Sequence, residues 1–161
     1  RGLGDVYKRQ MFNTSIRNNI CMYKEIDDKI VMEVCENSGL SDFISEVSLD
    51  YVVGQNGAML SGGQKQKIAL ARALVQNSPI VIFDEATSNT DVYSEQQING
   101  LLHTKLKEKT VIIITHKQEI LREADQIILL KDGIVIGTGR YDDLIKSNVD
   151  FKDMINMAER Y

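Results

Sequence analysis

The sequence predicts an α/β fold with a mainly parallel sheet at its centre. Two short apolar runs, Ile80–Phe83 and Thr110–Thr115, have the composition of buried parallel strands, and polar residues follow each of them. A helical pattern of apolar residues lies before the first run, and another lies between the two runs. Strands that alternate with helices along a chain are typical of a parallel sheet, so these runs define the fold class.

The first of these helical patterns begins at Ser61 and continues to Val75. Gln64 lies three positions after Ser61, which is the capping-box pattern of a helix N-terminus. Gly62 and Gly63 leave the first amide groups of this helix without side chains around them. A helix start carries about half a positive charge and suits an anion, most often a phosphate. Taken alone, however, the pattern is more simply a capped surface helix.

Acidic and basic side chains follow the two predicted strands. Asp84 and Glu85 come directly after the first apolar run, at the end of a strand where open α/β sheets bind ligands. One carboxylate there can hold Mg²⁺, and its neighbour can orient or deprotonate a water. His116 follows the second run. Each of these residues alone is more often structural, as a helix cap or a strand-end histidine.

The remaining periodicity predicts further helices. Between Glu25 and Phe43 the pattern indicates short amphipathic helices broken near Ser38-Gly39, with Ile26, Ile30, Val34, Leu40 and Phe43 inward. A longer helix is predicted from Val92 to Lys107, with Ile98, Leu101, Leu102 and Leu106 inward and His103 exposed.

The last part of the chain predicts a hairpin between helices. A short helix is expected around Ile120-Leu121, and a terminal helix is expected to begin at Tyr141. Between them, the runs 126–131 and 134–137 flank Asp132-Gly133, a strong signal for a two-residue β-turn.

Composition excludes several classes of protein. The 161 residues suffice for about one domain, with 43% hydrophobic and 26% charged residues, as in ordinary globular proteins. A formal net charge of -4 gives no basic footprint for nucleic acid. No apolar run approaches the roughly 20 residues that a membrane span needs. Cys21 and Cys35 have no metal-ligand spacing and are expected to be reduced, partly buried thiols without a role.

Together these motifs resemble the nucleotide-binding domain of the ATP-binding cassette (ABC) family, in its exporter type. The resemblance covers the chain from about Met11 to its end and rests on four motifs in the right order. They are the signature motif (Leu60–Gln64), the acidic strand motif with the catalytic glutamate (Ile80–Glu85), the D-loop (Ser88–Asp91, with Asn89-Thr90 in place of the usual Ala-Leu) and the switch histidine (His116).

The resemblance implies a P-loop NTPase-like ABC ATPase fold. Residues 11–78 would form the helical signature subdomain, and residues 79–161 would form the C-terminal part of the RecA-like catalytic core. The chain has no Gly-x-x-x-x-Gly-Lys-[Ser/Thr] loop, so the N-terminal part of the fold is expected to be missing. Residues 1–10 do not match the family and are interpreted as a non-native leader, so Gln10 is not assigned as the family's Q-loop glutamine.

The resemblance also implies the chemistry, which is hydrolysis of ATP with Mg²⁺ between two cassettes facing head to tail. The catalytic residues would be Glu85, which polarises the attacking water, and His116, which contacts the γ-phosphate. Asp84 would bind the Mg²⁺. The nucleotide held by the partner cassette would be covered by Ser61, Gly62, Gly63 and Gln64, while Asp91 would act across the dimer.

The expected partners are a second nucleotide-binding domain, identical or different, and a transmembrane domain fused upstream. Gln55, in a loop where the family usually has Glu, would contact that domain at the cytoplasmic face of the membrane. The fragment alone is expected to be inactive. The alternatives are a soluble ABC ATPase of the DNA-repair, chromosome-maintenance or translation-factor kind, and a regulatory cassette without catalysis. The segments Phe12–Ile20 and Gly54–Gly57 favour the exporter.

Overall fold

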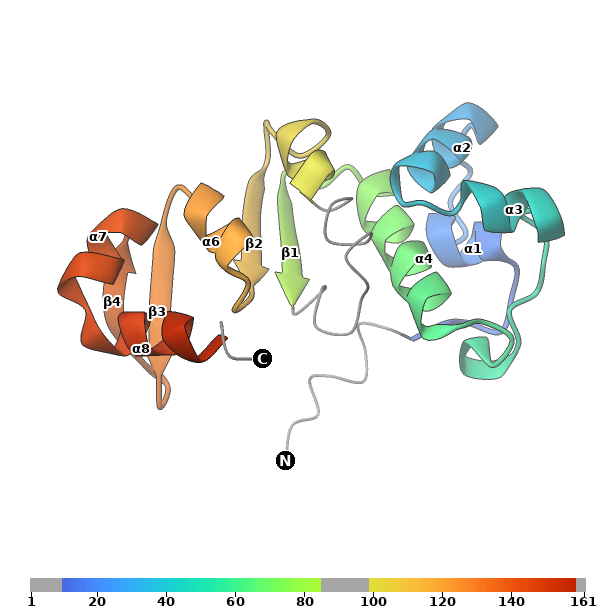
Figure 1. Cartoon of the computed structure of the whole chain (residues 1–161). Coiled ribbons are helices and arrows are strands. Elements are labelled where there is room, and N and C mark those ends of the chain that lie inside the picture. The colour runs from blue at the N-terminus through green and yellow to red at the C-terminus, as the bar shows by residue number, and fades with distance from the viewer. Residues whose placement is uncertain (1–9, 85–98, 159–161) are drawn as a thin grey trace. The chain divides into compact units, whose positions relative to one another are not determined.

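The computed structural model describes residues 10–84 and 99–158. Figure 1 shows its elements, which belong to two compact units. Unit 1 comprises the described residues up to 82 and those from 99 to 112, and unit 2 comprises residues 83–84 and 113–158. The sequence-based domain boundary between residues 78 and 79 stays a prediction.

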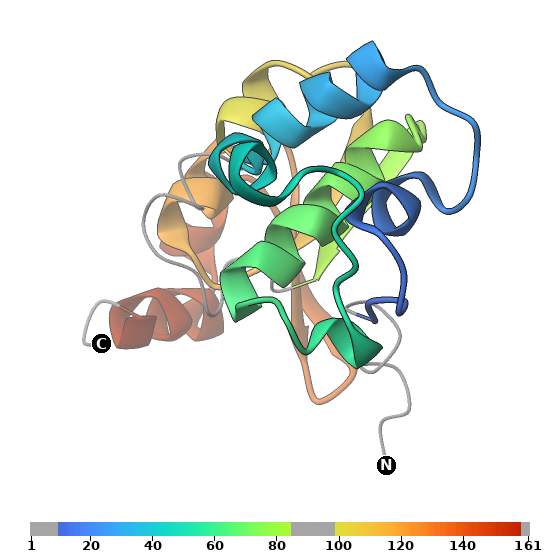
Figure 2. The same cartoon turned by 90° about the vertical axis from the view of Figure 1, so that its right-hand side faces the viewer.

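Unit 1 is built mainly from helices. They are α1 (Ile16–Cys21), α2 (Asp28–Asn37), α3 (Ser41–Val47), the 3₁₀ turn η1 (Gln55–Gly57) and α4 (Gly62–Val75). Side-chain caps fix the first two, because Ser15 accepts a hydrogen bond from the Asn18 amide and Asp27 accepts one from the Lys29 amide. Helix α4 packs against α1 and α2, as Figures 1 and 2 show.

The break predicted near Ser38-Gly39 is confirmed, because α2 ends at Asn37 and Gly39 has a φ of 68°. The predicted inward face of α2 is wrong at one position. Ile30 is 48% exposed, whereas the next residue, Val31, is fully buried. Packing against α1 and α4 turns the helix so that Val31, Val34 and Cys35 face the core. The buried core of unit 1 comprises Met11, Ile16, Ile20, Cys21, Val31, Val34, Cys35, Leu40, Ile44, Val53, Leu60, Ile68 and Ala71.

Strands β1 (Ile80–Asp84) and β2 (Thr110–Ile114) pair in a two-stranded sheet. The Thr110 amide donates to the Pro79 carbonyl over 3.0 Å. Both residues lie where their strands begin, so the two strands run in the same direction, and both arrowheads point the same way in Figure 1. The parallel pair is therefore confirmed, with β2 ending one residue earlier than predicted.

The helix predicted from Val92 to Lys107 is described only from residue 99, and it ends earlier than predicted. Residues 99–103 are helical and residues 104–108 form turns. The Thr104 hydroxyl donates to the Gly100 carbonyl over 2.7 Å, and the Leu106 amide returns to the Leu101 carbonyl. A backbone hydrogen bond from residue i+5 to the carbonyl of residue i is typical of a helix C-terminus. Leu101 and Leu106 are buried and His103 is exposed, as predicted.

Unit 2 places the predicted hairpin among three helices. Its elements are α6 (Gln118–Glu123), β3 (Ile127–Lys131), β4 (Ile134–Gly139), α7 (Tyr141–Ser147) and α8 (Val149–Ala158). Strands β3 and β4 are antiparallel, and their turn has positive φ at Asp132 (50°) and Gly133 (77°), as a primed hairpin turn requires.

The terminal helix is two helices rather than the single one predicted. Asn148 separates them, because its amide group donates to the Ile136 carbonyl over 3.0 Å and its Oδ1 accepts from the Phe151 amide. A side chain that bonds to β4 and also caps α8 ends α7 at this point. The buried core of unit 2 comprises Leu121, Ile127, Leu129, Tyr141, Leu144, Phe151 and Ile155.

Candidate functional site

The start of α4 has the capping box that the sequence predicts. The Ser61 hydroxyl accepts from the Gln64 amide over 3.2 Å, and the Gln64 side chain accepts from the Ser61 amide over 2.8 Å. These two bonds satisfy two of the donors that a helix start leaves over. The amides of Gly62 and Gly63 point out of the same turn without an intrahelical acceptor. The first turn holds no acidic side chain that would compete for them.

Among the described residues, nothing requires glycine at positions 62 and 63. A Cβ added at Gly62 or Gly63 would meet nothing within 4 Å, and neither residue has a positive φ. Gly57 is different, because its φ is +68° and a Cβ there would come within 2.9 Å of the Met11 side chain. Alanine is favoured over glycine inside helices by up to about 1 kcal/mol. The bare helix start is thus open, and local stability alone does not explain its glycines.

Gln55 lies in an exposed loop that leads into this helix. It begins η1, between Gly54 (φ 76°) and Asn56 (φ 53°). The Met59 amide donates to the Val53 carbonyl over 3.1 Å and closes the loop. Close packing of Gly57 against Met11 and Lys65 fixes the loop beside the first turns of α4. Gln55 is therefore exposed on a loop of defined conformation.

Asp84 and His116 come to the same edge of the β1–β2 sheet. Asp84 is the half-buried last residue of β1, and the exposed His116 follows the end of β2 by two residues. The Thr110 amide bonds to the Pro79 carbonyl, so the two parallel strands start side by side and bring their carboxyl ends to this edge. The Thr115 hydroxyl accepts from the Lys117 amide and shapes the turn that carries His116. Glu85 and Asp91 lie outside the described residues.

The described residues contain no cluster of three or more His, Cys, Asp or Glu side chains that would hold a metal by themselves. Mg²⁺ rarely needs such a cluster, because it usually keeps several waters and binds one or two carboxylates together with substrate phosphates. A single strand-end carboxylate such as Asp84 fits that donor set. The site residues therefore suit a magnesium ion that arrives with a phosphate ligand.

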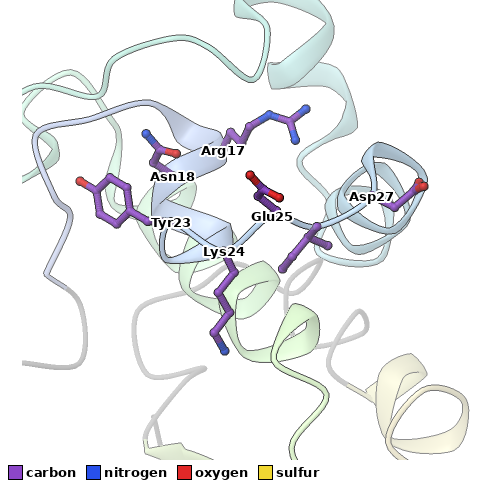
Figure 3. A pocket seen from close by; sticks show the side chains of 7 residues that line it. Arg17, Asn18, Tyr23, Lys24, Glu25 and Asp27 are labelled. Carbon is purple, nitrogen blue, oxygen red and sulfur yellow. The ribbon is translucent and has the colours of Figure 1, made fainter.

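An open depression of about 620 Å³ lies at the end of α1 and the loop leading to α2 (Figure 3). It contains none of the predicted site residues. Its lining is Arg17, Asn18, Tyr23, Lys24, Glu25, Ile26 and Asp27. Arg17 pairs with Asp28 over 2.9 Å, which joins α1 to α2 beside it.

Sequence patterns did not predict a polar junction between α4 and α1. Arg72 on α4 donates to the Asn19 backbone carbonyl over 2.7 Å and to the Asn19 side chain over 3.3 Å. Asn19 is fully buried, and its side chain bonds to the backbone of Phe12. Burial lowers the pKa of the Arg72 guanidinium. The two residues are 53 positions apart, so no local pattern signals their contact.

Comparison with known proteins decides the family. A profile described as ABC transporter matches residues 4–88, more than half of the 161 residues. This chain belongs to the ABC transporter family. The match begins within residues 1–10, whose interpretation as a non-native leader stays a prediction. In the described residues, no helix of this ABC family member is long and apolar enough to cross a membrane.

Curated relatives and a solved structure extend the match. The relatives named "ATP-dependent lipid A-core flippase" include one from Pseudoalteromonas translucida, 38% identical over 91% of this chain and 26% of the relative. The protein of that name from Aliivibrio fischeri is 41% identical over 84% of this chain and 24% of the relative. This ABC chain therefore spans about a quarter of the length of the curated relatives it matches.

The solved structure is titled "Structure of a bacterial Atm1-family ABC exporter with ATP bound". It aligns with a TM-score of 0.86 at 31% identity, covering 94% of this chain and 27% of that chain. The predicted fold class, a P-loop NTPase-like ABC ATPase fold with a helical subdomain, is confirmed.

Proposed function

We propose that this chain is part of the ATP-hydrolysing domain of an ABC exporter, which powers transport across a membrane. The observation that carries the proposal is the open start of α4, where Gly62 and Gly63 expose their amides although the fold does not require glycine. Bare amides at a helix start bind phosphate groups. The relatives named flippases and the exporter of known structure favour this function over a soluble ABC ATPase.

In this proposal the start of α4 covers a nucleotide held by a second cassette. The Ser61 hydroxyl and the amides of Gly62 and Gly63 donate to the γ-phosphate, while Gln64 keeps the turn closed through the capping box. Because the nucleotide then contacts both cassettes, it binds the closed pair better than the open one. ATP would therefore drive closure, as any ligand shifts a population toward the state that it binds better.

The edge of the β1–β2 sheet would serve a nucleotide on its own side. Asp84 would hold Mg²⁺ through water, and that ion would neutralise the charge of the β- and γ-phosphates. His116 would donate a hydrogen bond to the γ-phosphate from the same edge. Glu85, directly after Asp84, would orient the attacking water, and Asp91 would act across the pair of cassettes.

The free energy of ATP hydrolysis would be passed to a membrane domain of the same exporter. The exposed Gln55 would contact that domain. Gln55 offers an amide rather than a carboxylate, so the contact would be a neutral hydrogen bond. The chain would then work at the cytoplasmic face of a membrane, beside a second nucleotide-binding domain.

The substitution Gly63→Asp tests the proposal in the presence of a complete ABC nucleotide-binding domain loaded with ATP. An aspartate fits the open space at residue 63 and suits the positive end of a helix, so α4 should be as stable as before. Its carboxylate would repel the γ-phosphate, so ATP-dependent association, measured by titration calorimetry, should be lost. Gly100→Ala is the matched control, because a Cβ there also meets nothing within 4 Å. Equal association by both variants would overturn the proposal.

A second measurement concerns the chain alone. Without a Gly-x-x-x-x-Gly-Lys-[Ser/Thr] loop, the purified chain should release no phosphate from ATP above background. Turnover by the purified chain that disappears in Glu85→Gln would contradict this expectation.

A further inference from the structure

The junction between Arg72 and Asn19 is the polar centre of unit 1. Asn19 is fully buried, and the bonds of its side chain go to the backbone of Phe12, Thr14 and Ser15. The described bonds of the Arg72 guanidinium all go to neutral oxygens. Burying such groups is costly unless their hydrogen bonds are made. Each of the three guanidinium nitrogens of Arg72 therefore has an acceptor in the protein, which makes the junction more than a loose surface contact.

This junction joins three parts of the chain. Arg72 lies in the last turn of α4 and Asn19 lies in α1. Arg72 also donates to the Gln10 carbonyl over 3.4 Å, and its guanidinium lies 5.8 Å from the centre of the Phe12 ring. The segment 10–15 is thus bonded both to Asn19 and to Arg72.

We propose that Arg72 is a positioning residue that passes a displacement of the segment 10–15 to the open start of α4. The capped, 14-residue helix α4 is continuous from Gly62 to Val75, so it transmits a push at Arg72 over about 15 Å. Met11, in the same segment, packs against Gly57 and the loop that leads into α4. The segment therefore contacts α4 directly at Arg72 and, through Met11, the loop that leads into the first turn of α4. What the start of α4 does with this motion rests on the proposed function.

The test reads the amide resonances of Gly62 and Gly63 in the ¹⁵N-labelled chain. Phe12→Leu removes the ring under Arg72 at a half-exposed position, so the fold should be retained. We expect both glycine amide resonances to shift. Unchanged resonances at both glycines would overturn the proposal without any further variant.

A second variant asks whether Arg72 carries the effect. Arg72→Lys keeps the charge, but a single ammonium cannot replace the planar fork that reaches Asn19 and Gln10 together. In the Arg72→Lys variant we expect Phe12→Leu to leave the resonances of Gly62 and Gly63 in place. Tyr23→Leu, which removes an exposed ring, is the control and should have the same effect with Arg or Lys at position 72. An equal response to Phe12→Leu with Arg72 or Lys at this position would contradict the inference.

This readout uses neither nucleotide nor turnover. A failure of the Gly63→Asp comparison would therefore remove the proposed function and leave the junction intact. A failure of the resonance comparison would remove the junction's role and leave the nucleotide contact intact.

Discussion

The helices of unit 1 and the β1–β2 sheet differ in how they use aliphatic side chains. In the helices, Ile16, Ile20 and Ile68 are fully buried. In the sheet, one face is half-exposed, with Ile80, Ile82, Ile112 and Ile114 between 48% and 59% exposed. Parallel sheets in proteins are normally covered on both faces. The comparison teaches that unit 1 draws its stability from the buried helical core, whereas the open face of the sheet adds little.

The largest expected effect on the free energy of unfolding comes from truncating one isoleucine side chain to alanine in each region. Ile68→Ala should lower the free energy of unfolding by about 2–5 kcal/mol, because a fully buried side chain leaves a cavity. Ile82→Ala removes the same atoms at a position that is 59% exposed and should change it by about 0.5 kcal/mol or less. Urea titration followed by circular dichroism measures both, and equal losses would refute the contrast.

The next effect tests whether the helical core depends on a polar residue as well. Asn19→Leu should cost about 1–3 kcal/mol, since the Phe12 amide and the Arg72 guanidinium lose their acceptor inside the protein. Asn18→Leu is the control, because the neighbouring side chain is only half-buried and bonds to the Thr14 hydroxyl. If both variants unfold at the same urea concentration, the junction contributes nothing to stability.

A smaller effect is a pH dependence of the free energy of unfolding that arises in the helical core. Both described cysteines lie in that core. Burial, with a smaller contribution from Cys21, raises the pKa of the Cys35 thiol from 9.0 to about 11. The folded chain keeps this proton where the unfolded chain has lost it. The free energy of unfolding should therefore fall as pH rises from about 9 to about 11. Cys35→Ala should flatten that fall, and an unchanged pH profile would speak against it.

The smallest effect concerns the outer end of the helical region. Ser61→Ala removes the acceptor for the Gln64 amide and should cost about 1 kcal/mol. Ser61→Gly should lower the free energy of unfolding by only a few tenths of about 1 kcal/mol. Thermal unfolding followed at 222 nm distinguishes the two, and a cost at Ser61 as large as at Ile68 would remove the distinction between cap and core.

What the sequence predicts well is local. The capping box of Ser61 and Gln64 and the hairpin at Asp132-Gly133 depend on residues within a few positions of each other, and both are confirmed. The ends of the two parallel strands are also predicted correctly to within one residue, so the sequence places Asp84 and His116 at one edge of the sheet. The resemblance to a family predicts the fold class.

What the sequence predicts poorly depends on distant contacts. The periodicity of α2 places Ile30 inward, but contacts with α1 and α4 select Val31 instead. The terminal helix divides because Asn148 bonds to β4, twelve residues earlier in the chain. The junction of Arg72 and Asn19 spans 53 residues and has no counterpart in any local pattern.

The free space around Gly63 has a practical consequence when combined with the buried thiols. Cys21 and Cys35 are both buried, so a cysteine introduced at residue 63 would be the accessible thiol of the described part of the chain. A fluorescent dye attached there would sit at the tip of α4, where an added Cβ meets none of the described residues within 4 Å. Its colour or anisotropy would report, in real time, when another molecule approaches that tip.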